Sequence, residues 1–279
     1  MRFAKYHGLG NDFVVIDRLS GGDPIDPGLA VRICDRRRGV GADGVLTILP
    51  SKVATARMHV TNADGSVAQM CGNGIRCVAA YLADEHGAAQ ADLALETGAG
   101  VRACRLARQD GEVREVTVDM GKPELEASRI PICPALPGRF VRQDVMLGEL
   151  RVTATAVSMG NPHLVLLDVP AASAAELGPR LERHPLFPER TNVELVSMEG
   201  AGLAVTVWER GVGLTEACGT GACAAMVAAV LEGRLPPGDE RPVRLPGGVL
   251  HVRVLADLSR VWMRGPAERS FVGEMEWAG

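Results

Sequence analysis

The chain has 279 residues, a formal net charge of −4, 47% hydrophobic residues and seven cysteines. This charge argues against a basic nucleic-acid-binding surface or a polybasic membrane patch. No apolar run reaches the length of about 18 residues that a transmembrane helix needs, and the N-terminus lacks the apolar core of a signal peptide. Seven cysteines without a C-x-x-C pair indicate free thiols rather than a disulfide framework or a metal site. We therefore expect a cytoplasmic protein without metal.

The first half of the chain alternates short apolar strands with turns and two helices. A glycine-rich turn at 8–12 separates the first two strands, a short helix is expected at 29–35, and a second helix follows Cys71 and is closed by Gly87. The loose region 121–138 contains four prolines, which is typical of a linker. The expected strands are 2–7, 13–17, 45–49, 56–61, 93–96, 101–107 and 113–119.

The second half repeats this plan. A helix is expected at 171–183, and another follows Cys218 and is closed by Gly233. The expected strands are 150–159, 164–168, 192–196, 203–208, 243–245, 250–255 and 260–264. Three pairs of landmarks recur in the same order at a nearly constant offset, which indicates a duplicated lobe. The pairs are Asn11 and Asn161, Asn62 and Glu209, and Cys71 and Cys218.

The duplication predicts an α+β fold with two pseudo-symmetric lobes. Each lobe is expected to be a strand-rich sheet wrapped around one central helix, with the active site in the cleft between the lobes. Residues 1–120 form the N-terminal lobe, which carries Cys71, and residues 121–279 form the C-terminal lobe, which carries Cys218. The last segment, 268–277, is expected to pack back on the N-terminal lobe.

Cys71 and Cys218 each lie before a Gly-x-Gly turn and an Ala-rich helix. The first backbone N–H groups of a helix have no partner within it, and its dipole favours negative charge there. This setting favours a thiolate and binds anions. One such cysteine alone is more often a buried cap residue, but two that are related by duplication favour a functional pair.

Two helix starts that face each other could bind a carboxylate and place its α-carbon between the two thiols. One sulfur could then remove a proton from one face while the other delivers a proton to the opposite face, which is racemisation or epimerisation. The same N–H groups would stabilise the negative charge that develops on the carboxylate. The backbone groups expected to do this belong to Gly72, Asn73, Gly219 and Thr220.

The remaining polar landmarks suit an amino-acid ligand. Glu209 could hold an ammonium group and Arg210 a second carboxylate, although the two could equally be a solvated pair at a strand end. His163 could be a general base, but a histidine in such a turn is more often a structural group, so we expect it behind the ligand-binding residues. The asparagines at turns or strand edges, which could bind the ligand or only shape the turns, are Asn11, Asn62, Asn161 and Asn192.

Ordered motifs extend along nearly the whole chain. They are KYHGLGNDF at 5–13, NADGS at 62–66, MCGNGIRC at 70–77, GNPH at 160–163, TNVE at 191–194, ERG at 209–211 and TEACGTG at 215–221. Together they resemble the motifs of the diaminopimelate epimerase family. The resemblance implies interconversion of LL- and meso-2,6-diaminopimelate by two cysteines in lysine and peptidoglycan precursor biosynthesis. It also implies that the enzyme needs no cofactor and no metal and forms a homodimer.

The resemblance also implies which residues contact the substrate. These are Asn11, Asn62, Gly72, Asn73, Asn161, Asn192, Glu209, Arg210, Gly219 and Thr220, with Cys71 and Cys218 as the acid and base. Some family members carry a substrate-contacting glutamine directly after the equivalent of Asp43. This chain has Gly44 there, so we expect no contact from that position.

Two other functions fit parts of the sequence. A proline or hydroxyproline racemase of the same fold would use the same cysteine pair, but its substrate has one carboxylate, so Arg210 and the asparagines favour diaminopimelate. A non-catalytic thiol-containing binding protein would not exchange a substrate α-proton with solvent. A cysteine hydrolase is disfavoured because the order of motifs suggests no Cys–His–Asn arrangement.

Overall fold

The computed structural model describes residues 1–87, 92–109, 112–134 and 137–276, and these contain four α-helices, one 3-10 helix and eighteen strands. The chain divides into two compact units, one formed by Met1–Asp119 with Arg264–Gly279 and the other by Met120–Met263. Residues 135–136 of the expected linker and Trp277 of the expected last segment lie outside the described residues. Within the described residues, no helix combines the length and apolarity that crossing a membrane requires.

The first unit is a sheet in which neighbouring strands follow the order β18-β1-β2-β3-β4-β6-β7-β8, and β5 pairs with β4. The pairs β2–β3 and β4–β6 are parallel, and the others are antiparallel. The strands are β1 (Arg2–Gly8), β2 (Asn11–Asp17), β3 (Gly44–Leu49), β4 (Ala56–Asn62), β5 (Val67–Ala68), β6 (Asp92–Thr97), β7 (Gly100–Gln109), β8 (Glu112–Gly121) and β18 (Glu268–Glu274).

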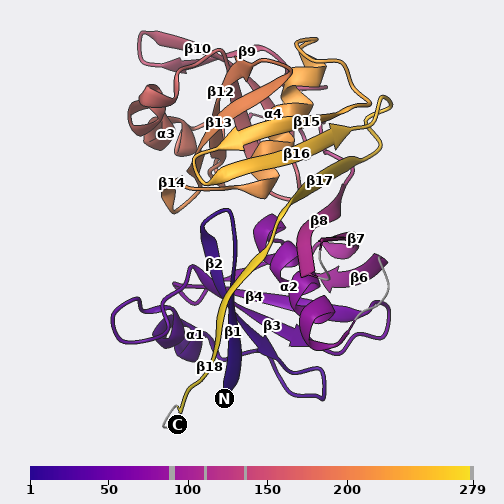
Figure 1. The fold of residues 1–279 in the computed structure, drawn as a ribbon. Coiled ribbons are helices and arrows are strands. Elements are labelled where there is room, and N and C mark those ends of the chain that lie inside the picture. The colour runs from indigo at the N-terminus through magenta and orange to yellow at the C-terminus, as the bar shows by residue number, and fades with distance from the viewer. Residues whose placement is uncertain (88–91, 110–111, 135–136, 277–279) are drawn as a thin grey trace. The chain divides into compact units, whose positions relative to one another are not determined.

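Helix α2 (Gly72–Glu85) lies at the centre of the first unit, where it contacts β1, β2, β3, β4, β6, β7 and β18 (Figure 1). All of its residues from Gly72 to Ala83 are buried. Its glycines and alanines suit this position, because they let the helix approach strands on several sides. The shorter helix α1 (Pro27–Cys34) packs on β3 and β4 and belongs to a separate apolar cluster with Phe3 and Val14.

The second unit has the same plan. Its strands are β9 (Gln143–Leu147), β10 (Leu150–Ser158), β11 (Pro162–Leu167), β12 (Asn192–Glu199), β13 (Gly202–Glu209), β14 (Gly213–Thr215), β15 (Glu240–Leu245), β16 (Gly248–Val254) and β17 (Val261–Pro266), the last of which crosses the unit boundary. Helix α4 (Gly219–Leu231) contacts β10, β11, β12, β13, β15 and β16. Helix α3 (Ala174–Glu182), which follows the 3-10 turn η1 (Ala171–Ser173), packs on β12, β13 and β14 (Figure 1).

Strand pairing confirms the duplication that the sequence predicted. The series β10-β11-β12-β13-β15-β16 has the same sequence of antiparallel and parallel pairs as β1-β2-β3-β4-β6-β7, and β14 pairs with β13 as β5 does with β4. The registers also match, because Phe13 lies opposite Gly44 in one unit and His163 opposite Asn192 in the other. Continued along the strands, these registers make Leu46 equivalent to Glu194 and Asn62 equivalent to Glu209.

The observed elements differ from expectation at three kinds of place. Strands β5, β9 and β14 were not predicted, because they are short and lie beside turn residues, and β18 was expected only as a segment that packs back on the first lobe. Helices α2 and α4 begin directly after their cysteines, so they include the Gly-x-Gly segments that were expected to be turns. The second lobe was expected to be 121–279, but the segment that joins the first unit begins at Arg264, before the expected 268.

Candidate active site

Cys71 is the N-cap residue of α2, as the sequence predicted. Its backbone is extended, with φ −139° and ψ 109°, and its Sγ accepts a hydrogen bond of 3.3 Å from the N–H of Gly74. The sulfur therefore satisfies one of the first N–H groups of the helix and lies at the positive end of the helix dipole. Gly72, the first residue of the helix, is buried, whereas Cys71 is only half-buried. The thiol thus combines an anion-stabilising position with access from solvent.

A chain of hydrogen bonds fixes the amides beside Cys71. Arg76, which is fully buried, donates to Asn73 Oδ1 at 3.0 Å and to the carbonyl of Gly72 at 3.1 Å. Asn73 Nδ2 then donates to Asn11 Oδ1 at 3.0 Å, and Asn11 Nδ2 donates to Asp43 Oδ2 at 2.7 Å. Two predicted site residues, Asn11 and Asn73, are therefore in direct contact, and each has its amide orientation set by a charged neighbour.

Asp43 belongs to a charged network beside this chain of amides. Arg36 contacts both Asp12 and Asp43 at 2.7 Å, and Lys5, which is buried, contacts Asp12 at 2.6 Å and the carbonyl of Gly41. Burial alone raises the pKa of Asp12, but hydrogen bonds from Arg36 and Lys5 outweigh it and lower that pKa to about 2. The carboxylate of Asp12 is therefore ionised at neutral pH, and hydrogen bonds from Arg36 and Lys5 hold it in place.

Asn62 lies at the end of β4, opposite Gly44 on β3. Its Nδ2 donates to Ser66 Oγ at 2.9 Å, and its backbone N–H donates to the carbonyl of Ser66, so its side chain is held by the following turn. A Cβ on Gly44 would lie 2.9 Å from the carbonyl oxygen of Thr61. A side chain at position 44 would thus require the β3–β4 backbone to shift, so glycine suits this position.

Cys218 repeats the geometry of Cys71 at the start of α4. Its φ is −127° and its ψ is 108°, its Sγ accepts a 3.4 Å hydrogen bond from the N–H of Gly221, and it lies 3.5 Å from Thr220 Oγ1. The side chain differs from Cys71 in burial, because Cys218 is only 7% exposed. Burial raises the pKa of the Cys218 thiol well above its usual range, and the negative charges of Glu209 and Glu194 raise it further. Cys218 is therefore held as a neutral thiol.

His163 and Glu194 form a fully buried pair on the neighbouring strands β11 and β12. His163 Nδ1 lies 2.6 Å from Glu194 Oε1, and His163 Nε2 lies 3.0 Å from Asn161 Oδ1. Burial raises the pKa of Glu194, although the charge of His163 opposes the shift. His163 thus links a predicted ligand-binding residue, Asn161, to a buried carboxyl group.

Asn192 and Arg210 are also joined. Asn192 is buried, donates through Nδ2 to the carbonyl of Pro162 at 2.8 Å, and accepts the backbone N–H of Arg210 at 2.9 Å. The Arg210 guanidinium donates to the carbonyl of Glu189 at 3.1 Å and is partly exposed. Glu209, at the end of β13, lies close enough to Cys218 to influence the charge of the thiol.

The predicted site residues thus fall into two groups, one in each unit. The first unit holds Asn11, Asn62, Cys71, Gly72 and Asn73, and the second holds Asn161, His163, Asn192, Glu209, Arg210, Cys218, Gly219 and Thr220. Sequence reasoning gave no role to Arg76 or Glu194. A signal for both existed, since each is a charged residue with apolar, buried neighbours on both sides in the sequence.

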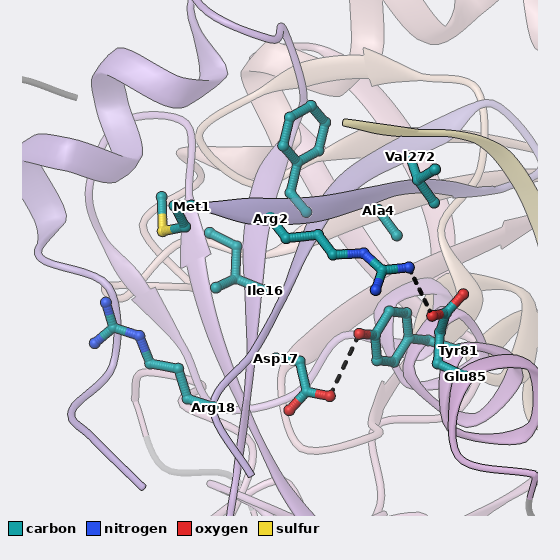
Figure 2. A pocket seen from close by; sticks show the side chains of 10 residues that line it. Met1, Arg2, Ala4, Ile16, Asp17, Arg18, Tyr81, Glu85 and Val272 are labelled. Atoms are coloured by element: carbon teal, nitrogen blue, oxygen red, sulfur yellow. Dashed lines mark hydrogen bonds and ion pairs between the residues drawn. The ribbon is translucent and has the colours of Figure 1, made fainter. Parts of the chain in front are cut away.

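A cavity of about 470 Å³ in the first unit lies away from these residues. Figure 2 shows its lining, which includes Arg2 paired with Glu85 and Tyr81 bonded to Asp17. Tyr81 and Glu85 come from the last turns of α2, the end of the helix opposite Cys71. The cavity is therefore not part of the candidate active site.

Comparison with known proteins finds relatives of nearly the whole chain. Residues 3–126 and 155–270 match the family model described as diaminopimelate epimerase. A protein named diaminopimelate epimerase from Desulforudis audaxviator is 50% identical to this chain, over 98% of this chain and 99% of its own length. Another protein of that name, from Pelotomaculum thermopropionicum, is 48% identical over 98% of each chain. A solved hydroxyproline epimerase from Agrobacterium vitis, with bound trans-4-hydroxy-L-proline, is similar in fold. Its TM-score is 0.72 at 17% identity, covering 98% of this chain and 90% of that chain.

Proposed function

Since the chain belongs to the diaminopimelate epimerase family and is an isomerase, we propose that it interconverts LL- and meso-2,6-diaminopimelate. In this proposal Cys71 and Cys218 are the acid and base, no cofactor takes part, and the reaction serves lysine and peptidoglycan precursor biosynthesis in the cytoplasm. The resemblance to the family further supports a homodimer.

The observation that carries the proposal is the repeated thiol geometry. Both cysteines are N-caps of buried helices at equivalent positions of a duplicated fold, and each sulfur accepts the N–H of the third helical residue. A structural cap needs no thiol, because Ser, Thr, Asp and Asn cap helices better. Two cysteines at equivalent caps are therefore better explained by proton transfer than by helix stability.

The proposed reaction requires the two units to bring their cysteines to opposite faces of one α-carbon. The thiolate of one cysteine removes the α-proton, and the electron pair of the broken C–H bond moves into the carboxylate. The N–H groups at the starts of α2 and α4 stabilise the charge that develops there. The thiol of the other cysteine then gives its proton to the opposite face, so the configuration is inverted and the two sulfurs have exchanged protonation states.

The surrounding residues have matching roles in this proposal. Asn11, Asn73 and Asn161 present amide groups whose orientation is fixed by internal hydrogen bonds, as binding in a preorganised site requires. Glu209 binds an ammonium group of the substrate. Arg210, whose guanidinium is partly exposed, binds the distal carboxylate. The list of proposed contacts is completed by Asn62, Gly72, Asn192, Gly219 and Thr220.

Exchange of the α-proton with solvent tests the proposal. Purified enzyme is incubated with LL-diaminopimelate in D₂O, and NMR follows the loss of the α-proton signal while chiral chromatography follows the meso product. We expect deuterium incorporation together with epimerisation, both abolished in Cys71→Ala and Cys218→Ala. Full activity in either variant would rule out the two-thiol mechanism, and the absence of any exchange would favour a binding protein.

The same assay with L-proline separates the second candidate. The structural neighbour named as a hydroxyproline epimerase shares only the fold at 17% identity, so it does not by itself favour proline. We expect no exchange at the α-carbon of proline or hydroxyproline. Arg210→Met should raise KM for diaminopimelate, because the distal carboxylate loses its partner. Faster turnover of proline than of diaminopimelate would reverse the assignment.

A further inference from the structure

Glu194 has a position that the proposed reaction leaves unexplained. It lies in the middle of β12 (Asn192–Glu199), its side chain is fully buried, and one carboxyl oxygen, Oε1, lies 2.6 Å from His163 Nδ1. The other oxygen, Oε2, is buried and has no hydrogen-bond partner among the described residues. A carboxyl group in such a place is costly, because burial removes its hydration and only part of it is compensated. A position of this cost suggests a role beyond packing.

The contacts of His163 show what Glu194 does on one side. Both ring nitrogens face oxygen atoms, Glu194 Oε1 at 2.6 Å and Asn161 Oδ1 at 3.0 Å. An amide oxygen only accepts, so Nε2 must carry a proton and donate it to Asn161. One further proton lies in the bond between Nδ1 and Glu194. The carboxyl group therefore fixes the ring, and the ring occupies the oxygen of Asn161 and leaves its NH₂ group available to a ligand.

The surroundings of Gly221 show that Glu194 also lies close to Cys218. A Cβ on Gly221 would lie 2.9 Å from Glu194 Oε1 and 3.3 Å from Cys218 Sγ. The carboxyl oxygen and the sulfur thus both lie within 3.3 Å of one point in the first turn of α4, where Gly221 has no side chain. The charged groups that act on Cys218 are Glu209 from β13 and Glu194 from β12, and both favour its protonated form.

The first unit lacks this arrangement. Leu46 occupies the position equivalent to Glu194, Phe13 that of His163, and a Cβ on Gly74 would meet Leu46 Cδ2 at 3.0 Å and Cys71 Sγ at 3.4 Å. The fold is therefore built equally well with an apolar pair at these positions. The carboxyl group and the imidazole are consequently specific to the Cys218 half and are not a requirement of the scaffold.

We propose that Glu194 is a positioning residue, which fixes Asn161 through His163 on one side and keeps Cys218 a thiol on the other. The proposal rests on the proposed function, in which Asn161 binds the substrate and Cys218 exchanges a proton with it. It makes the two cysteines unequal before substrate arrives, because Glu194 stands beside Cys218 where the first unit has Leu46 beside Cys71. Glu194 itself does not touch the substrate.

Cysteine alkylation in the free enzyme tests the effect on Cys218. Iodoacetamide is applied between pH 6 and 10, and mass spectrometry of the peptides gives separate rates for Cys71 and Cys218. The midpoint of the Cys218 profile is expected above the value of about 8.5 for a free thiol. In Glu194→Gln this midpoint should fall by a unit or more, which raises the rate at neutral pH about tenfold or more. The Cys71 profile should not move.

A matched control and a conservative variant complete the test. Leu46→Gln places the same amide at the equivalent position of the first unit and should leave the Cys218 profile unchanged. Glu194→Asp retains the charge and should return the Cys218 midpoint toward that of the wild type. An unchanged Cys218 midpoint in folded Glu194→Gln overturns the proposal. If that variant does not fold, a wild-type Cys218 midpoint at or below the free-thiol value overturns it equally.

Steady-state kinetics test the effect on Asn161. With diaminopimelate, Glu194→Gln should lower kcat and raise KM, because both the thiol and the amide are misplaced, whereas Asn161→Ala should raise KM and leave the Cys218 alkylation profile in place. Alkylation needs no substrate. A shifted Cys218 profile without any epimerase activity in the wild type would therefore refute the proposed function while supporting the role of Glu194 at Cys218.

Discussion

Replacing Arg76 with leucine should destabilise the first unit strongly. Arg76 is fully buried. It donates to the carbonyls of Gly72 at 3.1 Å and Pro266 at 3.0 Å and to Asn73 Oδ1 at 3.0 Å. Leucine leaves these acceptors without their donor, and each buried unsatisfied group costs about 1–3 kcal/mol. Some relaxation of the site offsets part of this sum. We expect the free energy of unfolding to fall by about 3–5 kcal/mol, because three buried oxygens lose a donor.

The two tyrosines give an assay specific to this unit. Tyr6 and Tyr81 are the only tyrosines of the chain, both belong to the first unit, and their buried rings pack edge to face at 6.1 Å. Urea unfolding followed by tyrosine absorbance therefore reports the first unit. Arg37→Leu, an exposed arginine of the same unit, is the control and should change stability by no more than about 0.5 kcal/mol. A loss below about 1 kcal/mol in Arg76→Leu would refute the reasoning.

Two other predictions follow from close approach and from charge. Gly221→Ala should lower kcat about tenfold or more with little loss of helix. The reason is that the new Cβ would meet Glu194 Oε1 at 2.9 Å and Cys218 Sγ at 3.3 Å. An unchanged kcat with an intact circular dichroism spectrum would contradict this. Asp12 has a folded-state pKa of about 2, below the unfolded value of about 3.9, so it stabilises the first unit fully above about pH 4. That contribution, on the order of 2 kcal/mol, is lost as the pH falls through about 2, and Asp12→Asn should show a smaller loss of stability on acidification in the same tyrosine assay.

Sequence patterns predicted the scaffold well where hydrophobic spacing and turn residues agreed. Glycines after α2 and α4, Gly87 and Gly233, have positive φ values of 59° and 70°, as helix-closing residues require. The nearly constant offset among three pairs of landmarks, of which Cys71 and Cys218 are one, predicted the duplication, and the matching strand pairs confirm it. These features are local or repeated, so a single sequence contains them in full.

The polar networks could not be predicted in the same way. Which donor reaches Asn11 depends on Asn73, 62 residues away, and the contact between His163 and Glu194, 31 residues apart, depends on strand pairing between β11 and β12. Such contacts are set by tertiary geometry, which residue type and spacing do not specify. The sequence therefore indicated the asparagines as candidates, but not the charged groups, Arg76 and Glu194, that orient them.

The two units differ at the positions of Glu194 and His163, and this difference allows a direct test of how far these two residues depend on each other. In the first unit, the fully buried Leu46 occupies the position that Glu194 has in the second unit. Phe13 occupies the position of His163, the partner of Glu194. Leu46→Glu alone would bury a carboxyl group with no imidazole beside it, and we expect a loss of about 3–5 kcal/mol in the tyrosine assay.

Adding Phe13→His to Leu46→Glu supplies the missing partner. The double variant should recover about 1–3 kcal/mol relative to the sum of the single changes, a coupling typical of directly interacting groups. Such coupling means that the histidine and the carboxyl group stabilise each other on this sheet and must be exchanged together. Strict additivity would show instead that His163 and Glu194 are tolerated independently, and that the short contact between them contributes nothing to the stability of the second unit.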